Sequence, residues 1–443
     1  MSSELQMCKI LPQQEDDISS RADLLPTNKL DEWFFSTIGS QATLQRGFDI
    51  TKAEQRSGAV PVVSSSGISS FHDSAKVKGP GVVLGRKGVV GSVHFLEVDF
   101  WPHDTTLWVK DFHGNNPKFV YYFFLGNSHE LKGLDVGSAN PTLNRNHVHP
   151  IKTIWPSLAE QNNIAEFLGT LDDRIALLHE TNATLEGVAQ ALFKSWFVDF
   201  DPVHANAGTQ AATLPPELQT LFPATFTETP QGSVPEGWGW VTLDEISEVG
   251  IGKTPPRKEQ HWFSESPSDT RWVSIRDMGM CGAYIATTSE FLTQEAVERF
   301  NVRVVPTNTV MLSFKMTIGR VAISDGAMTT NEAIAHFKLS EKSQISSEFI
   351  YLHLKSFDYS TLSSTSSIAD AVNSKTVKNI PILLADASVL AEFQNRIEPI
   401  FGKIKVIEQQ AQTLATLRDT LLPRLISGQL RLPDAEAALA EVV

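Results

Sequence analysis

Cysteine is scarce in this sequence. Among 443 residues only Cys8 and Cys281 occur, far apart and without CxxC spacing, which argues against a disulfide framework and a cysteine-based zinc site. No apolar run approaches the ~20 residues needed to cross a bilayer. The N-terminus also lacks the basic segment and apolar stretch of a secretory signal. These absences predict a cytoplasmic protein without a membrane segment.

Positive charge is also in short supply. The net charge is −14, although a DNA-binding surface needs Lys and Arg for phosphate contacts. The acidity is concentrated in residues 157–202, with 2 basic and 8 acidic side chains (2 − 8 = −6). Residues 31–156 carry 12 and 11 (+1), and residues 235–385 carry 14 and 17 (−3). Any DNA binding must therefore depend on focused patches or on a partner.

Catalytic signatures are missing as well. The sequence contains no glycine-rich cofactor fingerprint, no methyltransferase Asn/Asp-Pro-Pro-aromatic motif, no GxSxG elbow and no zinc deaminase signature. Residues 250–254 end like a P-loop, but Ser247 stands where a Walker A motif needs glycine. A glycine turn that presents Lys253, Thr254, Arg257 and Lys258 to a phosphate backbone is the better interpretation. The pattern indicates a non-catalytic binding or scaffold subunit.

The strongest positive feature is an internal repeat. The segment 82–93 matches 310–321 at an offset of 228, with Lys87 and Lys315 at equivalent positions (315 − 87 = 228). Residues 119–121 match 349–351 at 230, and Asn144 matches Asn373 at 229. Such self-similarity indicates two domains of common ancestry.

The early part of each copy is less regular. Trp33 is matched with Trp240 and Gly47 with Gly252, at offsets of 207 and 205. The second copy must then hold about 23 extra residues, because Gly252 precedes Lys315 by 63 positions and Gly47 precedes Lys87 by 40. Two domains with a common core and different loops are suited to the recognition of two different sequences. Gene duplication followed by drift also explains the pattern.

Both copies end in a heptad pattern. Apolar residues recur in alternating steps of four and three from Ile164 to Trp196, and again 229 positions later from Phe393 to Leu425. Each narrow apolar seam needs a partner helix, and antiparallel pairing of the two would form a coiled coil with one domain at each end. The polar seam residues Asn182 and Arg418 either fix the register, mark a further protein's contact, or lie near solvent.

These patterns predict a mixed α/β or α+β fold with pseudo-two-fold symmetry, in which two tandem homologous domains are separated by a long antiparallel two-helix coiled coil. Short β-branched runs such as 81–90 and 303–314 are typical of strands. Residues 203–234 lack Lys and Arg and have the composition of a linker. The expected order is an N-terminal tail (1–30), domain 1 (31–156), the central helix (157–202), the linker (203–234), domain 2 (235–385), the distal helix (386–430) and a C-terminal tail (431–443).

The segment around Asn144 carries two further hypotheses. His147 and His149 have the spacing of metal ligands on a strand, but no acidic or cysteine partner lies nearby in sequence, so no metal site is predicted. A polar turn is the better interpretation, because Asn and Arg form the bidentate contacts that recognise A and G. Asn373 to Lys375 repeats this chemistry in domain 2.

Two helical segments resemble one known family. Residues 156–202, with Leu171-Asp-Asp-Arg-Ile175 and the run from Leu192 to Pro202, are similar to the central helical region of type I restriction–modification specificity (S) subunits. Residues 417–430 are similar to the distal helical region, and Trp238-Gly-Trp240 to a domain start. The long acidic segment before domain 1 and the weak start at 31–33 depart from this pattern, and leave that boundary open.

The resemblance implies a non-catalytic DNA-specificity subunit with two target-recognition domains, each of which reads half of a bipartite site. The helices would space the domains and dock two methyltransferase (M) subunits for adenine methylation. Two restriction/translocase (R) subunits would add ATP-dependent cleavage of unmethylated DNA. S-adenosylmethionine, ATP and Mg²⁺ are then expected on the partner subunits and no cofactor on this chain.

Loops that bear Lys, Arg or Asn at matching places are the predicted contacts with double-stranded DNA. In domain 1 these are Arg46, Lys52, Arg86, Lys87, Asn144 and Arg145; in domain 2 they are Lys253, Thr254, Arg257, Arg276, Lys315, Asn373 and Lys375. The predicted coiled-coil and partner-binding residues are Ile164, Leu171, Ile175, Asn182, Leu185 and Trp196, with Ile400, Ile404, Leu414, Arg418 and Leu421.

Other classes of function stay open from sequence alone. A protein-only scaffold would use the coiled coil to join partners without binding DNA. A hidden nuclease would need clustered carboxylates that the sequence does not display. Within the family, the chain could serve a system that only methylates. The target sequence does not follow from the residues, because recognition also depends on loop geometry and DNA deformability.

Overall fold

The computed structural model describes residues 33–134, 142–340, 343–362 and 372–441. The predicted tail at 1–30 lies outside these residues. The chain divides into two compact units. Unit 1 comprises residues 1–176 and 412–443, and unit 2 comprises residues 177–411. Each unit therefore holds one globular domain and about half of each long helix.

Unit 1 is a mixed α+β fold around three sheets. A four-stranded sheet has the order β2-β8-β5-β6, a three-stranded sheet the order β4-β3-β7, and β1 pairs with β9. The strands are β1 (Trp33–Thr37), β2 (Thr43–Arg46), β3 (Val60–Ser64), β4 (Gly67–His72), β5 (Gly81–Gly85), β6 (Val93–Leu96), β7 (Trp101–Pro102), β8 (Thr106–Asp111) and β9 (Lys152–Pro156). The short helices are α2 (Ile38–Gln41), α3 (Pro117–Gly126), α4 (Ser128–Gly133) and α5 (Arg145–Val148). The apolar helix α3 covers β5 and β6 and completes the main core.

Unit 2 repeats this plan with additions. Its larger sheet has the order β13-β21-β18-β19-β16, its second sheet the order β14-β17-β15-β20, and β12 pairs with β22. The strands are β12 (Gly239–Thr242), β13 (Glu248–Ile251), β14 (Phe263–Ser264), β15 (Thr270–Val273), β16 (Tyr284–Ile285), β17 (Glu290–Leu292), β18 (Val310–Ser313), β19 (Val321–Ser324), β20 (Thr329–Thr330), β21 (Ile334–Lys338) and β22 (Pro381–Leu384). The helices are α9 (Leu243–Ile246), η1 (Gln260–Trp262), α10 (Ile275–Met278), α11 (Gln294–Arg299), α12 (Ser347–Ser356), η2 (Tyr359–Leu362) and α14 (Ser374–Lys378).

The two units share one topology, which confirms the internal repeat. The order β2-β8-β5-β6 recurs as β13-β21-β18-β19, and β3 lies parallel to β7 as β15 lies parallel to β20. The early elements α2 and β2 correspond to α9 and β13 at a constant offset of 205. Trp240 of β12 lies opposite Leu383 of β22, and the equivalent of Leu383 in β9 is Ile154 (383 − 154 = 229), which lies opposite Phe35 of β1. Trp240 therefore corresponds to Phe35, and Trp33 corresponds to Trp238. The predicted match of Trp33 with Trp240 is therefore wrong by two residues.

A glycine is required at the same place in both units. A Cβ atom on Gly47 would lie 2.1 Å from the carbonyl oxygen of His103, and one on Gly252 would lie 2.2 Å from that of Asn331. No side chain fits this close to the backbone. Only glycine therefore allows the chain after β2 to pass the β7–β8 turn, and the chain after β13 to pass the β20–β21 turn. The match of Gly47 with Gly252 is confirmed.

The extra residues of unit 2 form α10, β16, β17 and α11, between β15 and β18. The additional strand β16 is attached to the second long helix by Glu408. This carboxylate accepts hydrogen bonds from the backbone N–H groups of Ala283 (2.8 Å) and Tyr284 (3.1 Å). Burial raises the pKa of Glu408 to about 7, against the opposing effect of these two donors.

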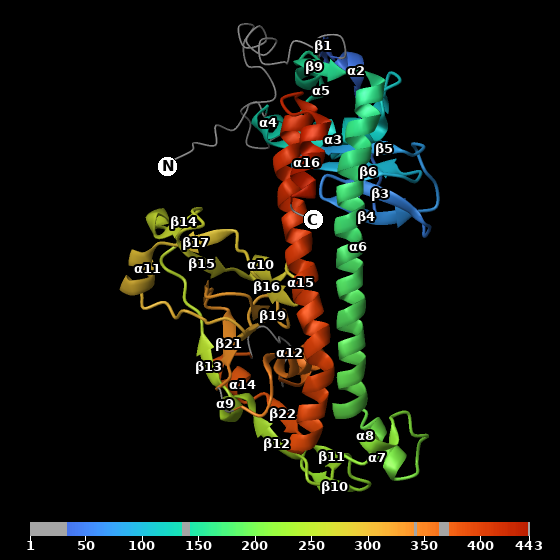
Figure 1. The fold of residues 1–443 in the computed structure, drawn as a ribbon. Coiled ribbons are helices and arrows are strands. Elements are labelled where there is room, and N and C mark those ends of the chain that lie inside the picture. Colours follow the sequence, from blue (N-terminus) through green and yellow to red (C-terminus); the bar gives the residue numbers. More distant parts are fainter. Residues whose placement is uncertain (1–32, 135–141, 341–342, 363–371, 442–443) are drawn as a thin grey trace. The chain divides into compact units, whose positions relative to one another are not determined.

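The two predicted heptad segments form α6 (Leu158–Phe197) and α15 (Ala387–Ile426), each of 40 residues. Both ends of α15 follow the ends of α6 by 229 residues, as the sequence repeat predicts. Within unit 2, Asn182 contacts Ile404 and Phe193 contacts Phe393, so the helices pack antiparallel (Figure 1). The mixed α+β fold and the long helix pair are thus confirmed.

The polar seam residues make bonds from one helix to the other. Asn182 is 9% exposed and donates from Nδ2 to the carbonyl oxygen of Ile404 (3.2 Å) in unit 2. Arg418 forms an ion pair with Asp172 (2.6 Å) in unit 1, and Asp172 also accepts from the Tyr122 hydroxyl (2.6 Å). Both contacts favour one alignment of the helices, which is the register role.

The remaining seam residues are buried or half-buried. Those assigned to unit 1 are Ile164, Leu171, Ile175, Leu414 and Leu421, and those assigned to unit 2 are Leu185, Trp196, Ile400 and Ile404. In unit 2, Phe193, Phe197 and Phe349 surround the fully buried Phe393. This aromatic cluster joins α6, α12 and α15.

Two segments predicted as a linker and a C-terminal tail contain secondary structure. Residues 203–234 include most of α7 (Asp201–Asn206), all of α8 (Pro216–Gln219) and β10 (Phe226–Thr229), and part of β11 (Gly232–Pro235). They bury Leu218 and Phe222. The predicted tail contains α16 (Leu432–Ala440), whose Ala435 is fully buried in the core of unit 1. Among the described residues no helix is both long and apolar enough to span a membrane.

Candidate nucleic-acid interface

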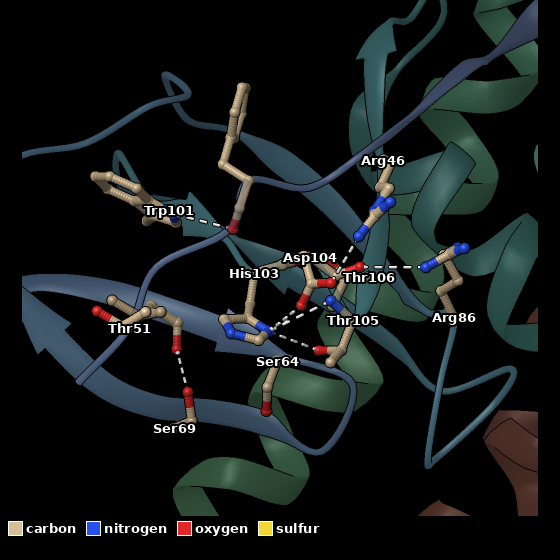
Figure 2. Close-up of polar contacts among 12 residues, drawn as sticks. Arg46, Thr51, Ser64, Ser69, Arg86, Trp101, His103, Asp104, Thr105 and Thr106 are labelled. Atoms are coloured by element: carbon tan, nitrogen blue, oxygen red, sulfur yellow. Dashed lines mark hydrogen bonds and ion pairs between the residues drawn. The ribbon is translucent and has the colours of Figure 1, made fainter. Parts of the chain in front are cut away.

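Three of the predicted basic residues of unit 1 lie around one turn. Arg46 ends β2 and Arg86 follows β5, and both adjoin the β7–β8 turn at 103–105 (Figure 2). Lys87, the next residue, contacts the same turn through its backbone. Arg46 pairs with the Asp104 carboxylate (2.8 Å), and the backbone N–H of Lys87 donates to the carbonyl oxygen of Thr105 (3.0 Å). The fold therefore brings these basic residues together at one end of the strands of the main sheet.

Asp104 orients these two arginines. The Arg86 guanidinium donates to the Asp104 carbonyl oxygen (3.5 Å), while the Asp104 carboxylate holds Arg46. Burial lowers the pKa of Arg86, the positive charge of Arg46 lowers it further, and Asp104 opposes both effects. A phosphate oxygen near both guanidinium groups would relieve this repulsion.

The segment that carries Asn144 and Arg145 joins the same edge. Leu143 donates its backbone N–H to the carbonyl oxygen of Arg86 (3.0 Å), and Thr142 forms a β-bridge with Lys87. Arg145 is exposed on α5. Lys52 is exposed in a separate turn and makes no hydrogen bond or ion pair with this group in the described part of the chain.

Both predicted asparagines cap short helices. The Oδ1 atom of Asn144 accepts from the backbone N–H of Asn146 at the start of α5. That of Asn373 accepts from Lys375 and Thr376 at the start of α14. Asparagine is a preferred N-cap residue, so capping explains both positions without a base contact. Base recognition by these two side chains stays a prediction.

Three predicted residues of unit 2 form hydrogen bonds within the unit. They are Lys253, Thr254 and Arg257. Lys253 donates to the carbonyl oxygen of Phe300 (2.5 Å), and the Thr254 hydroxyl donates to Glu332. No α-helix begins directly after residues 250–254, because the next element is the three-residue η1, so the turn does not form a P-loop.

Arg257 is held more firmly. It forms two hydrogen bonds with Glu290 (2.7 and 2.8 Å) and stacks over Phe263 and Trp272. The hydrogen bonds that Arg257 donates to Glu290 raise the pKa of Arg257, while burial lowers it. The structure thus gives Arg257 an internal role that the sequence did not predict.

The other three predicted basic residues of unit 2 are exposed. Lys315 lies in the β18–β19 turn, at the place that Lys87 occupies in unit 1, and its ammonium group lies 5.5 Å from the Phe314 ring. Arg276 is exposed on α10 and Lys375 on α14. No described carboxylate pairs with these three side chains, so their charges are available to a ligand.

No metal site is assembled from His147 and His149. The Nε2 atom of His149 accepts from the backbone N–H of Leu44 (2.9 Å), and burial together with Arg145 lowers the pKa of His149. In the described chain, only Asp49, His103 and Asp104 place three such ligand atoms within 4.8 Å of one another. Because Asp104 already pairs with Arg46, this group does not indicate a cation site.

A family model described as the type I restriction modification DNA specificity domain matches residues 31–187 and again residues 235–409. The chain belongs to this family. Its two specificity domains are the homologous domains of units 1 and 2, and the matched ranges include part of α6 and of α15.

Individual proteins show the same similarity. The HindI specificity subunit of Haemophilus influenzae is 27% identical over 333 residues, which cover 66% of this chain and 71% of the relative. The MjaIX specificity subunit of Methanocaldococcus jannaschii is 24% identical over 330 residues, covering 72% and 70%. The crystal structure of a type I S subunit from M. genitalium covers 91% of this chain and 98% of its own, at 16% identity and a TM-score of 0.53. That last likeness supports the fold.

Sequence reasoning missed one pair of positions on the long helices. Leu177 on α6 is 61% exposed and Val406 on α15 is 56% exposed, and the two are equivalent in the repeat (406 − 177 = 229). Both directly precede a seam residue and lie outside the seam, on a part of the helix surface that usually carries polar or charged side chains in a coiled coil. The offset of 229 applied outside the seam would have found them.

Proposed function

We propose that this chain gives a type I restriction–modification enzyme its DNA specificity, with each specificity domain reading one half of a bipartite target. The main support for the proposal is a lysine-bearing turn that occurs at the equivalent position of both domains. Lys87 and Lys315 follow equivalent strands, β5 and β18, and both are exposed. The loops around them differ, which allows each domain to recognise a different half-site.

Phosphate contacts are best assigned to the basic residues that the fold leaves exposed. These are Lys52, Lys87, Arg145, Arg276, Lys315 and Lys375. Arg46 and Arg86 join them through the Asp104 turn. Lys253, Thr254 and Arg257 are better explained as supports of their loop, because internal partners hold them.

Two methyltransferase subunits are proposed to dock on the long helices at Leu177 and Val406. A pseudo-two-fold repeat offers the same contact twice, so two identical partners can bind one chain while two different half-sites are read. An exposed apolar side chain at each equivalent position is suited to such a contact. The partners would supply S-adenosylmethionine, and two translocase subunits would supply ATP-dependent cleavage with Mg²⁺. This chain would add no catalytic group and no cofactor.

Replacing both Lys87 and Lys315 with alanine tests the DNA assignment. Each lysine that neutralises a phosphate releases about one counterion, so the slope of log K against log salt should fall by about 2 in the double variant. Binding should weaken for all sequences alike, because phosphate contacts carry no base information. Fluorescence anisotropy of the assembled complex on duplex DNA, from low to high salt, measures both effects.

Lys110 and Lys338 provide the control. They are equivalent in the repeat (338 − 110 = 228), exposed, and lie near the far ends of β8 and β21 from the β7–β8 and β20–β21 turns. Their double alanine variant removes the same charge and should leave the salt slope unchanged. Equal slopes for wild type and the Lys87→Ala/Lys315→Ala variant would show that these turns do not contact DNA.

A further inference from the structure

Met316 is a large apolar side chain in an unusual setting. It is 86% exposed, and its backbone φ is +59°, in the left-handed region that few L residues adopt. Exposure of a single apolar residue is ordinary on a protein surface. The conformation is not, because a non-glycine residue there costs about 1–2 kcal/mol.

The repeat shows which residue the backbone would accept without strain. Met316 corresponds to Gly88 of unit 1 (316 − 88 = 228), and Gly88 has a φ of +79°. Both positions directly follow the equivalent lysines, Lys87 and Lys315. The turn therefore needs a left-handed residue in both units, and unit 2 places a methionine where glycine would be relaxed. Packing within the folded domain does not explain why methionine occupies this position, because its side chain is almost wholly exposed to solvent.

The turn holds Met316 in a fixed position. Thr317 donates its backbone N–H to the carbonyl oxygen of Lys315 (2.7 Å), which closes a three-residue turn with Met316 at its apex. Ser313 anchors the end of the loop, because its hydroxyl donates to the carbonyl oxygen of Thr317 (2.5 Å) and its own carbonyl oxygen accepts from Gly319 (3.0 Å). The side chain is thus presented outward by a rigid support beside an exposed cation.

We infer that Met316 is a specificity-determining residue of unit 2, which contacts the 5-methyl group of a thymine in the half-site that this unit reads. The inference rests on the proposed function and names one residue of its DNA surface. A thioether side chain offers no strong hydrogen-bond donor or acceptor, so it discriminates by apolar contact. The thymine methyl is the apolar group that base pairs display in the major groove. Lys315 beside it is placed to hold the phosphate backbone.

Met316→Gly is the direct test, because glycine suits the backbone and the variant should fold at least as well as wild type. The probe is a DNA duplex that contains the motif methylated by the wild-type complex. The protein is the full chain together with its methyltransferase subunits. Wild type should lose affinity about fourfold when one thymine of the half-site read by unit 2 is replaced by uracil, which lacks the methyl group. Met316→Gly should bind the thymine duplex about tenfold more weakly and should not distinguish thymine from uracil.

Val304→Ala is the control, since Val304 is also exposed in unit 2 (48%) but lies outside the turn. It should retain the discrimination between thymine and uracil. If wild type methylates a bipartite motif but Met316→Gly keeps the same affinity and the same discrimination, the inference is wrong and the proposed function stands. A uniform loss of affinity together with reduced DNA bending would indicate a wedge between base pairs and would also overturn the methyl contact. A wild-type complex without any sequence preference would overturn the proposed function itself.

Discussion

Substituting aspartate for both Leu177 and Val406 is expected to leave the chain folded but unable to hold either methyltransferase subunit. The two side chains are 61% and 56% exposed, so the changes remove little core packing. A carboxylate buried at a protein interface without a partner costs several kcal/mol, which is enough to abolish a contact of ordinary affinity. Native mass spectrometry of co-expressed subunits measures the outcome.

The single variants make this prediction specific. Leu177→Asp and Val406→Asp should each retain one methyltransferase subunit per chain, because the repeat offers two independent sites. Val198→Asp is the matched control, since Val198 is 48% exposed beside the end of α6 and its counterpart in the repeat is Ser427. Two bound subunits on the double variant would place the docking surface elsewhere.

The second large effect concerns stability. Phe393→Ala should lower the free energy of unfolding of unit 2 by about 3–5 kcal/mol, because a fully buried ring is replaced by a cavity. The lost ring packs on Phe193, Phe197 and Phe349, so α6, α12 and α15 all lose contacts.

Urea unfolding followed by tryptophan fluorescence reports this change, because Trp196 lies beside Phe393. Phe34→Ala is the control, as Phe34 is 48% exposed and its removal should change the unfolding free energy by less than about 1 kcal/mol. Similar values for the two variants would mean that the aromatic cluster does not hold the helices to the domain.

The framework of the molecule could be predicted from sequence because it is periodic. Heptad seams and a constant offset of 229 anticipated two helices of equal length, and the offset of 228 anticipated β5 and β18. The start of each domain was harder to align. The nearby Trp238 and Trp240 are both candidates for Trp33. Strand pairing with β9 and β22, together with the offset of 205 shared by β2 and β13, selects Trp238.

Composition was a poor guide to residues 203–234. The segment lacks basic residues and periodicity, as linkers do, yet it buries Leu218 and Phe222. Short elements can fold against an existing core without a long pattern of their own, because tertiary packing outweighs local propensity.

The candidate interface, too, could be predicted only in part. Sequence reasoning found the exposed lysines through their equivalent positions, but it could not distinguish them from basic residues with internal partners. Arg257 meets Glu290 and Trp272, which lie 33 and 15 residues further along the chain, and no local pattern announces such contacts. Asn144 and Asn373 likewise cap helices too short to be recognised in advance.

Long-read methylation sequencing of host DNA would show whether this chain directs methylation to a specific sequence. A host that expresses this chain with the neighbouring methyltransferase subunit is compared with a host that lacks the chain. We expect a new N6-methyladenine motif, split into two short half-sites by a fixed unspecified gap. Absence of any new motif, with the methyltransferase intact and bound to this chain, would contradict the claim that the two domains read DNA.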